Sequence, residues 1–397
     1  MKIYILTGEP FPNGMASTKR IICYAKALLC AGEKVEIIIY RRTENNIITP
    51  RNTVGRSQFE GIKYRYIGGT PIRNKKKIYR PFEDLFDKLR TWYFFRRNIG
   101  QGDVVIGYLN SKILWSLIFI GIIHRRGGKY ISELCEIPFV FYNKHLYHCK
   151  KMFCTKVLFK LYDGIIPISH SLEQFATKYV SSSCRILRVP ILTDVDKYEA
   201  SNSVDEKDLY IFHSGTLYEN KDGISGILEA MGMAVVQNKV PIRFITTGNI
   251  ELSPDFEKIK SVIDKYGIQD RIESLGYVEE SKLKQYLKSA AIVIVNKLPT
   301  IQNTYCFSTK IGEYAASGKA IITTDFGEQA HWFKNGYDSI IVPSGNTEEI
   351  AKAIVKLMDY QTRSFVGNNA RLSCSKNFDY RRWSYPLKNF VELCTKD

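Results

Sequence analysis

The chain has 397 residues, of which 45% are hydrophobic and 24% charged, and its formal net charge is +17 at pH 7. This length exceeds one ordinary hydrophobic core, and the composition excludes disordered and fibrous proteins, so we expect two globular domains. The charge is unevenly shared: residues 1–190 hold 32 Lys and Arg against 13 Asp and Glu, whereas residues 191–397 hold 25 against 27. A basic first half indicates an anionic partner.

The N-terminal sequence and the cysteines favour a cytoplasmic protein. Lys2 is followed at once by a short strand pattern, which differs from the long apolar stretch of a signal peptide. The nine cysteines are scattered and odd in number, so we expect reduced and mostly buried thiols. The longest apolar run, over 113–123, is too short to span a bilayer and predicts a buried helix.

The first half alternates between strand and helix patterns. An apolar strand leads through a loop rich in Gly and Pro into an amphipathic helix, which Ser17 or Thr18 can cap and which Gly32 ends. A second strand follows, and this order is the βαβ pattern of a parallel sheet. The expected strands are 3–7, 35–40, 104–106, 129–132, 164–169 and 185–189.

The second half repeats this alternation after a polar stretch over 193–208, which is typical of an interdomain linker. The expected strands are 209–213, 242–247, 272–275, 292–296, 320–323 and 339–342, and the expected helices are 225–236, 254–266, 280–290, 309–317 and 347–358. The sequence thus predicts an α/β fold with doubly wound domains over 1–192 and 209–375, and a terminal helix within 376–397 that packs back toward the first domain. Strand carboxyl ends of two such domains face a central cleft, where ligands bind.

The clearest chemical signal lies at the start of the helix expected over 309–317. Ser308 and Thr309 open this helix directly after a loop, and free N–H groups at a helix start suit a phosphate or diphosphate. Lys310 lies in the first turn, where a cation is unfavourable unless an anion offsets it, and Glu313 lies one turn further on the same face. A carboxylate there can accept hydrogen bonds from a ribose. The same spacing also fits a capped helix with a Lys–Glu surface pair.

This segment resembles the signature of glycosyltransferase family 4, the retaining GT-B enzymes, in which two glutamates frame the donor site as E-x7-E. Glu313 falls on the second glutamate, and the Ala-Ala-Ser-Gly-Lys-Ala-Ile-Ile run after it is typical of that helix–strand turn. The sequence Phe307-Ser308-Thr309-Lys310 resembles the Phe-Pro-Thr-Lys form of some members. The resemblance implies that Glu313 and Lys310 are catalytic and that Phe307, Ser308 and Thr309 bind the donor.

Other segments follow in the order that this family has. Gly215 and Thr216, and then Lys221, resemble the Gly-Arg pair and the later lysine that grip the donor diphosphate. The resemblance implies donor binding at Gly215 and Thr216 and a catalytic cation at Lys221. Thr216 stands in place of the arginine and Tyr305 in place of the first glutamate, so the chain departs from the pattern twice. Lys310 can supply the missing positive charge.

The first half carries weaker matches to the same family. Gly14 matches the glycine loop that approaches the donor phosphates, although a single glycine in such a loop is usually only a turn. Glu133 and Glu136 follow a strand end, where the family has residues that face the acceptor and the sugar. Either glutamate fits a helix-capping carboxylate equally well.

The resemblance implies a GT-B fold, two Rossmann-like domains, and a retaining transfer of sugar from a nucleoside-diphosphate-sugar. The acceptor is expected to be a hydroxyl of a lipid-linked saccharide or of a surface polysaccharide precursor. The two departures leave open a catalytically silent nucleotide-binding scaffold of the same fold, and a nucleotide-sugar epimerase is a third hypothesis.

No metal or other resident cofactor is expected, because the family generally uses the nucleotide-sugar without one. One group of possible ligands lies close together in the sequence, but its spacing matches no common zinc pattern and apolar residues interleave it. Ordinary helix packing is the expectation for these residues, which are His145, His148, Cys149 and Cys154.

A run of basic residues precedes an aromatic-rich helix in the first half. The basic residues are Arg73, Lys75, Lys76, Lys77 and Arg80, the apolar face holds Phe82, Leu85, Phe86, Leu89, Trp92 and Tyr93, and the helix closes with Arg96 and Arg97. This combination suits an anionic membrane surface, so we expect a peripheral protein at the inner face of the plasma membrane. The alternative is a helix docked on the first domain. Nucleic acid is not expected, because no recognition fold or stacking motif accompanies the charge.

Overall fold

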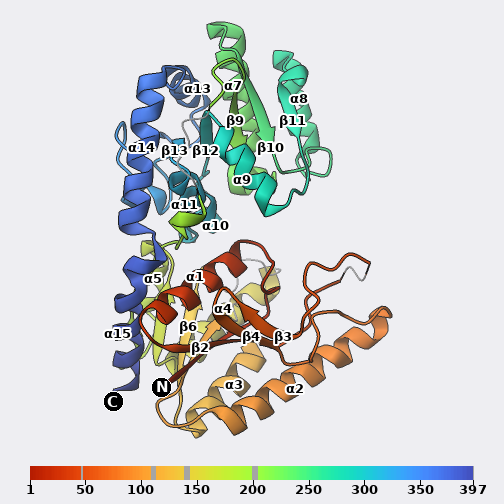
Figure 1. Cartoon of the computed structure of the whole chain (residues 1–397), viewed down its shortest axis with the longest axis vertical. Coiled ribbons are helices and arrows are strands. Elements are labelled where there is room, and N and C mark those ends of the chain that lie inside the picture. The colour runs from red at the N-terminus through yellow and green to blue at the C-terminus, as the bar shows by residue number, and fades with distance from the viewer. Residues whose placement is uncertain (46–47, 109–112, 138–143, 199–203, 397) are drawn as a thin grey trace. The chain divides into compact units, whose positions relative to one another are not determined.

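The computed structural model describes residues 1–45, 48–108, 113–137, 144–198 and 204–396. Its contacts divide the chain into two compact units, the first formed by Met1–Leu192 with Tyr380–Asp397 and the second by Thr193–Asp379 (Figure 1). Within the expected linker, residues 199–203 lie outside the described residues. The chain therefore returns to the first unit with its last residues.

The first unit is built on an eight-stranded sheet of order β3-β4-β2-β1-β5-β6-β7-β8. Neighbouring strands pair in parallel except β3 and β4, which form an antiparallel hairpin that the sequence patterns did not predict. The strands are β1 (Lys2–Thr7), β2 (Lys34–Ile39), β3 (Arg56–Phe59), β4 (Ile62–Tyr66), β5 (Val104–Tyr108), β6 (Lys129–Leu134), β7 (Gly164–Pro167) and β8 (Arg185–Ile186).

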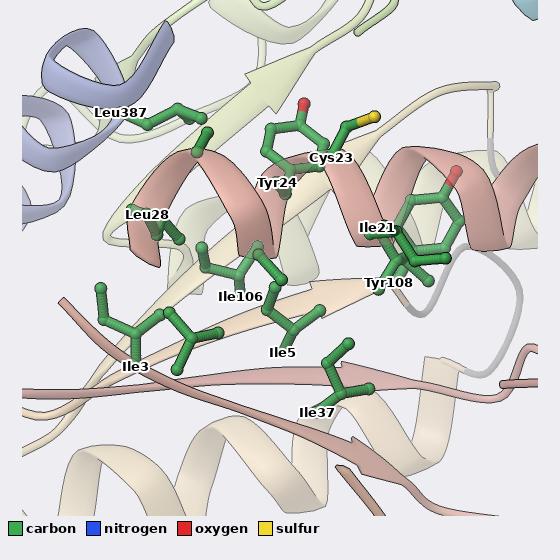
Figure 2. Close-up of a cluster of buried hydrophobic side chains, with 14 of the residues drawn as sticks. Ile3, Ile5, Ile21, Cys23, Tyr24, Leu28, Ile37, Ile106, Tyr108 and Leu387 are labelled. Carbon is green, nitrogen blue, oxygen red and sulfur yellow. The ribbon is translucent and has the colours of Figure 1, made fainter. Parts of the chain in front are cut away.

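Helices cover both faces of this sheet. Ile5, Ile37 and Ile106 of the strands pack against α1 and, through Leu387, against α15, as Figure 2 shows. Tyr4 points to the opposite face, because successive side chains of a strand alternate, and its ring contacts Phe94 and Phe95 of α2. The helices are α1 (Ala16–Cys30), η1 (Lys77–Tyr79), α2 (Arg80–Asn98), α3 (Ile113–Arg125), α4 (Lys144–Lys156), η2 (Leu158–Leu161), α5 (His170–Thr177), η5 (Tyr380–Trp383) and α15 (Ser384–Thr395).

The start of α1 differs from the sequence-based expectation. The N-cap residue is Met15, which makes no side-chain capping hydrogen bond, so Ser17 and Thr18 lie inside the first turn and the predicted cap is wrong. Thr18 Oγ1 donates instead to the carbonyl oxygen of Pro10 at 2.7 Å and fastens the preceding loop to the helix. The predicted end is confirmed, because α1 ends at Cys30 and Gly32 follows with a φ of 82°.

The second unit is built on a six-stranded parallel sheet of order β11-β10-β9-β12-β13-β14. The strands are β9 (Leu209–His213), β10 (Ile242–Thr246), β11 (Ile272–Ser274), β12 (Ile292–Val295), β13 (Ala320–Thr324) and β14 (Ile340–Val342). The helices are η3 (Val195–Lys197), α6 (Glu219–Asp222), α7 (Ile224–Asn238), α8 (Phe256–Tyr266), η4 (Gln269–Arg271), α9 (Glu280–Ser289), α10 (Ile301–Tyr305), α11 (Thr309–Ala316), α12 (Gln329–Trp332), α13 (Thr347–Lys356) and α14 (Tyr360–Asn377).

Each sheet buries an apolar core, and none of the described helices is both long and apolar enough to cross a lipid bilayer. The apolar run over 113–123 forms most of α3, whose side chains at Phe119, Ile120, Ile122 and Ile123 are buried. In the second unit, β9, β10 and β12 contribute Ile211, Phe244 and Ile294 to the core beneath α7 and α13.

Candidate functional site

The carboxyl ends of β9 and β12 meet where the strand order of the second sheet reverses. Strands β10 and β11 lie on one side of β9, whereas β12, β13 and β14 lie on the other. Doubly wound sheets open a crevice at such a point, and ligands bind there. His213 is the last residue of β9, and Asn296 and Lys297 follow β12 directly, so the chain places polar side chains at this reversal.

Three polar side chains, those of Lys297, Lys310 and His213, meet around Asp222, the last residue of α6. Lys297 Nζ donates to Asp222 Oδ1 at 2.9 Å, and Lys310 Nζ donates to Asp222 Oδ2 at 2.8 Å. Lys310 Nζ also lies 3.0 Å from His213 Nε2. The side chains of Asp222, His213 and Lys297 are 2%, 1% and 3% exposed, whereas that of Lys310 is 15% exposed. Lys310 is therefore the member of this aspartate cluster that an incoming ligand can reach.

The aspartate cluster carries excess positive charge. The pKa of Lys310 is lowered to about 8, by burial first and also by the ammonium groups of Lys297 and Lys221, against the opposing effect of Asp222. Burial raises the pKa of Asp222, but the ammonium groups of Lys310 and Lys297 lower it by more than burial raises it. This carboxyl therefore titrates well below its ordinary range. Burial and Lys310 together lower the pKa of His213 to about 3, which keeps the imidazole neutral at pH 7. Two ammonium groups thus pair with one carboxylate, and a third, that of Lys221, acts on Lys310, a balance that suits an anionic ligand.

The loop after β9 lies against the Lys310 side chain. Gly215 has a φ of 109°, a conformation that side chains disfavour, and a Cβ at this position would lie 3.3 Å from Lys310 Cε. The backbone N–H of Gly215 donates to Thr247 Oγ1 at 2.9 Å. Next to it, the backbone N–H of Ser214 donates to the buried hydroxyl of Tyr314 on α11 at 2.8 Å. The structure thereby brings two predicted residues together, Gly215 and Lys310.

The other residues predicted around the helix start have different environments. Phe307 is buried, and its ring packs with Trp332 and Phe378 at centroid distances of 6.5 and 5.8 Å, so it anchors the loop before α11. Ser308 is the N-cap residue of α11 but makes no side-chain capping hydrogen bond, and Ser308 and Thr309 are half-buried. The first-turn N–H groups of α11 therefore receive no capping hydrogen bond from the Ser308 side chain.

The remaining predicted residues of the second unit lie on α6, α11 and the loop after β9. Lys221 is half-buried, and its carbonyl oxygen accepts a hydrogen bond from Lys297 Nζ at 2.9 Å. Its ammonium group acts on the pKa of Lys310, so these two predicted cations share one electrostatic environment. Glu313 is half-buried on α11, one turn after Lys310, and Thr216 is exposed.

Known proteins similar to this chain share its fold and point to its class. Residues 208–360 match the family model of Glycosyl transferases group 1. An uncharacterized glycosyltransferase of Methanocaldococcus jannaschii is 24% identical over 346 residues, which cover 83% of each chain. The structure of sucrose-phosphate synthase from Thermosynechococcus elongatus has a TM-score of 0.72 at 15% identity, covering 98% of this chain and 97% of that one. The chain is a glycosyltransferase.

The fold comparisons also confirm the predicted fold class of this glycosyltransferase. Its two parallel-sheet Rossmann-like domains match those of GT-B enzymes such as sucrose-phosphate synthase. The structure of Anabaena HepE in complex with UDP-glucose has a TM-score of 0.66 at 12% identity, covering 98% of both chains. At such identities the likeness concerns the fold.

In the first domain of the glycosyltransferase, the two predicted glutamates differ in exposure. Glu133 is fully buried, and Arg20 of α1 donates to its Oε1 at 2.6 Å. Arg20 also donates to the carbonyl oxygens of Val189 and Pro190, so this pair ties α1 and β6 to the segment after β8. Burial raises the pKa of Glu133, although Arg20 opposes the shift. Glu136, just beyond β6, is half-buried.

Gly14 lies in the loop between β1 and α1 of the glycosyltransferase and is half-buried. A Cβ at this position would lie 2.0 Å from Thr18 Oγ1 and 2.8 Å from the carbonyl oxygen of Pro10. The hydrogen bond between these two atoms therefore requires a residue without a side chain at position 14.

Three members of the aspartate cluster, His213, Asp222 and Lys297, were not among the predicted site residues. Asp222 directly follows Lys221, and Lys297 lies two residues after the last residue of β12. A signal for Lys297 did exist, because polar residues directly after a continuous apolar strand mark the end of the sheet at which ligands bind. Nothing local distinguishes Asp222 from the other acidic residues of its loop.

No group of three or more His, Cys, Asp or Glu side chains is arranged to hold a metal ion within the part of the glycosyltransferase that the structure describes. The side chain of His145 lies outside this part. Of its sequence neighbours, Cys149 is exposed and Cys154 is buried.

Proposed function

We propose that this glycosyltransferase moves a sugar from a nucleoside-diphosphate-sugar to a hydroxyl of a lipid-linked saccharide or a surface polysaccharide precursor. We place it among the retaining enzymes of family 4, on the resemblance carried by Glu313 and the segment around it. The observation that carries the proposal is the aspartate cluster, where Lys310 and Lys297 bind a single carboxylate at the reversal point of the sheet and Lys221 adds positive charge near Lys310.

The donor diphosphate is assigned to Lys310, Lys221 and the first turn of α11. An ammonium group has three N–H bonds, and those of Lys310 serve Asp222 and His213 within the described residues, which leaves one for a phosphate oxygen. The N–H groups at the start of α11 offer further donors beside it. As the bond between sugar and diphosphate breaks, negative charge grows on the leaving phosphate, and these fixed donors stabilise it.

The nucleoside side of the donor is assigned to Glu313, whose carboxylate can accept hydrogen bonds from the ribose hydroxyls. Anabaena HepE, which has a similar fold, was solved with UDP-glucose, and this supports a nucleotide-sugar as the donor class. Gly14, Gly215, Thr216, Ser308 and Thr309 are the further donor-binding residues of the proposal. Neither a metal nor another cofactor is part of it.

The acceptor side is assigned to the basic first domain. The excess of Lys and Arg in residues 1–190 favours an anionic surface, as a lipid-linked saccharide at the inner face of a membrane would present. Of the two glutamates predicted there, Glu136 is the acceptor-side residue of the proposal, because Glu133 is fully buried and bonded to Arg20.

A thermal-shift screen with UDP, GDP and their sugar conjugates tests the donor assignment. A ligand at a hundred times its Kd adds about 2.7 kcal/mol to the free energy of unfolding, so the matching nucleotide should raise Tm by several degrees. With that donor in hand, Glu313→Ala should abolish transfer and leave Tm of the free protein unchanged. Glu348→Ala, on the first turn of α13, is the matched control and should keep full activity.

Three outcomes would contradict the proposal. Full transfer activity in Glu313→Ala would remove this residue from the site. Tight nucleotide binding without any transfer or donor hydrolysis would favour the silent scaffold, which the departures at Thr216 and Tyr305 allow. Conversion of the donor sugar without an acceptor would favour an epimerase.

A further inference from the structure

A pocket of about 370 Å³ lies in the first domain between the β3–β4 hairpin and the C-terminal half of α2. Four arginines line it, and no acidic residue does; the arginines are Arg56, Arg65, Arg90 and Arg97. Tyr93 and Phe94 form aromatic parts of its wall. Such a lining is selective for a compact anion.

The four arginines differ in how far their charge is already balanced. Arg65 donates to Glu36 at 2.5 Å, and Arg90 donates to Asp87 at 3.2 Å. Arg56 and Arg97 have no carboxylate partner among the residues that the structure describes. The guanidinium group of Arg97 lies over the ring of Tyr93 at 4.6 Å. Two unbalanced positive charges therefore face the pocket, one of them held by an aromatic ring.

The helix that borders the pocket exposes a long apolar face. The exposed large apolar side chains of η1 and α2 are Ile78, Tyr79, Phe82, Leu85, Phe86, Leu89 and Tyr93. Within α2 they recur at intervals of three and four residues, which places them on one side of the helix. Phe82 and Phe86 are 59% and 56% exposed. The face predicted from the sequence is thus largely open to solvent, with Trp92 half-buried at its margin.

The opposite face of α2 fastens the helix to the first domain. Asp87, Thr91 and Phe95 recur every four residues and are buried. Asp87 lies 3.5 Å from Arg42, and the ring of Phe95 packs on Phe119 of α3 at 6.0 Å. Figure 1 shows α2 and α3 side by side in the first domain. Because α2 is held by this other face, its exposed apolar residues are not the face that docks on the domain.

We propose that the exposed face of α2 and the adjacent arginine pocket form a docking site for the surface of an anionic phospholipid bilayer. The apolar side chains enter the boundary between headgroups and acyl chains, and the pocket receives a headgroup phosphate. Lys75, Lys76 and Lys77 are exposed directly before the helix and add positive charge at the same surface. This site rests on the proposed function only in placing the acceptor at a membrane.

Charge complementarity alone would also fit a nucleic acid, but the apolar face favours the bilayer. A phosphodiester backbone neutralises arginines and leaves exposed leucine and phenylalanine side chains in water. A bilayer interacts with both the arginines and the apolar side chains, because its interface presents phosphates directly above an apolar layer. The arrangement of arginines beside a strip of large apolar side chains matches that layering.

Co-sedimentation of the full chain with phospholipid vesicles tests the site without any donor or acceptor. The protein should bind vesicles of phosphatidylcholine mixed with phosphatidylglycerol and should stay in solution with phosphatidylcholine alone. Phe82→Ser with Phe86→Ser should weaken binding at least about tenfold, since two large apolar side chains no longer leave water. The control pair, Phe365→Ser with Leu372→Ser on exposed positions of α14, should bind like the wild type.

The pocket has its own variant and control. Arg56→Gln with Arg97→Gln should weaken vesicle binding about tenfold or more. Lys63→Gln with Lys178→Gln removes the same charge from exposed positions of the same domain and should weaken it much less. Inorganic phosphate should compete better than chloride at equal ionic strength, because the pocket recognises phosphate and not merely charge.

Three results would overturn the site: no binding of the wild type to anionic vesicles, equal weakening by the pocket and control pairs, or retention of a labelled single-stranded RNA in place of vesicles. The thermal shift with the nucleotide donor is measured on every variant and should stay unchanged. Loss of vesicle binding with an intact donor shift is thus separable from a failure of the proposed transfer.

Discussion

Lys310 has to stay charged in a nearly closed environment, and Asp222 is the residue that allows it. Burial and two neighbouring lysines lower the pKa of Lys310 to about 8, whereas the carboxylate of Asp222 raises it. The same carboxylate also pairs with Lys297, which has almost no contact with water. One acidic side chain therefore supports two cations, and its loss leaves both without their counter-ion.

We expect Asp222→Asn to lower the free energy of unfolding by about 3–5 kcal/mol, because it leaves the buried Lys297 ammonium unpaired. Urea unfolding measures this change. The double variant Asp222→Asn with Lys297→Met should recover part of the loss, since the second substitution removes the stranded charge. An Asp222→Asn protein as stable as the wild type would show that the aspartate cluster does not hold Lys297 in place.

At the scale of elements, α11 is fixed to the end of β9 by a hydrogen bond between segments a hundred residues apart. The Tyr314 hydroxyl accepts from the backbone N–H of Ser214, and the Tyr314 side chain is fully buried. This bond sets where the first turn of α11, and with it Lys310, lies against Gly215. The position of the groups proposed to donate hydrogen bonds to the diphosphate thus depends on one hydroxyl group.

Tyr314→Phe should cost about 1–3 kcal/mol in the free energy of unfolding, because the Ser214 N–H stays buried without its partner. The nucleotide thermal shift should shrink as well, since α11 is less firmly placed. Tyr385→Phe, at an exposed position of α15, is the control and should change neither quantity. If Tyr314→Phe lowered stability and left nucleotide affinity intact, the hydroxyl would serve the fold alone.

The elements that the sequence predicted well are those with a continuous apolar pattern. Each strand expected in the second half is present within one or two residues, and most of these strands are buried and largely apolar, as strands covered on both faces are. The β3–β4 hairpin was missed, since Arg56, Ser57 and Gln58 are exposed and give no apolar alternation. Helix α14 was missed for a related reason. It is polar around most of its surface and buries Arg363 and Asn369 by hydrogen bonding and packing.

Of the candidate site, only the residues that lie within the local sequence motifs were predicted. Lys310, Gly215 and Lys221 follow from local sequence and lie near one another in the structure. The partnership of Lys310 with Asp222 spans 88 residues, so it depends on the strand order and has no local signature. Glu133 shows the converse. It was expected just after a strand, facing the acceptor and the sugar, whereas the structure places it within β6, where Arg20 binds it.

At the scale of the whole molecule, the last eighteen residues of the chain belong to the domain that its first residues begin. Helix α15 packs on α1, and it buries four apolar side chains in the first domain, those of Leu387, Phe390, Val391 and Cys394. The first domain therefore lacks part of its core until residues 380–397 have been synthesised.

A chain that ends at Asp379 should lose a stable first domain. Four buried apolar side chains contribute about 1.5–3 kcal/mol each, which together rivals the total stability of about 5–15 kcal/mol of an ordinary domain. Hydrogen exchange should show loss of protection in β1 and β2 and retained protection in β9 and β12. Removal of Lys396 and Asp397 alone should have no effect. Protected β1 amides in the shortened chain would show that α15 is dispensable.

The two points at which the backbone passes between the units lie side by side. Thr193, the first residue of the second unit, donates its backbone N–H to the carbonyl oxygen of Phe378 at 2.8 Å, one residue before that unit ends. Topologically, the second unit is thus an insert within the first, and a backbone hydrogen bond already joins its two ends. A short linker from Leu192 to Tyr380 would join the two segments of the first unit directly. Residues 193–379 would then form a separate protein whose two ends lie close together.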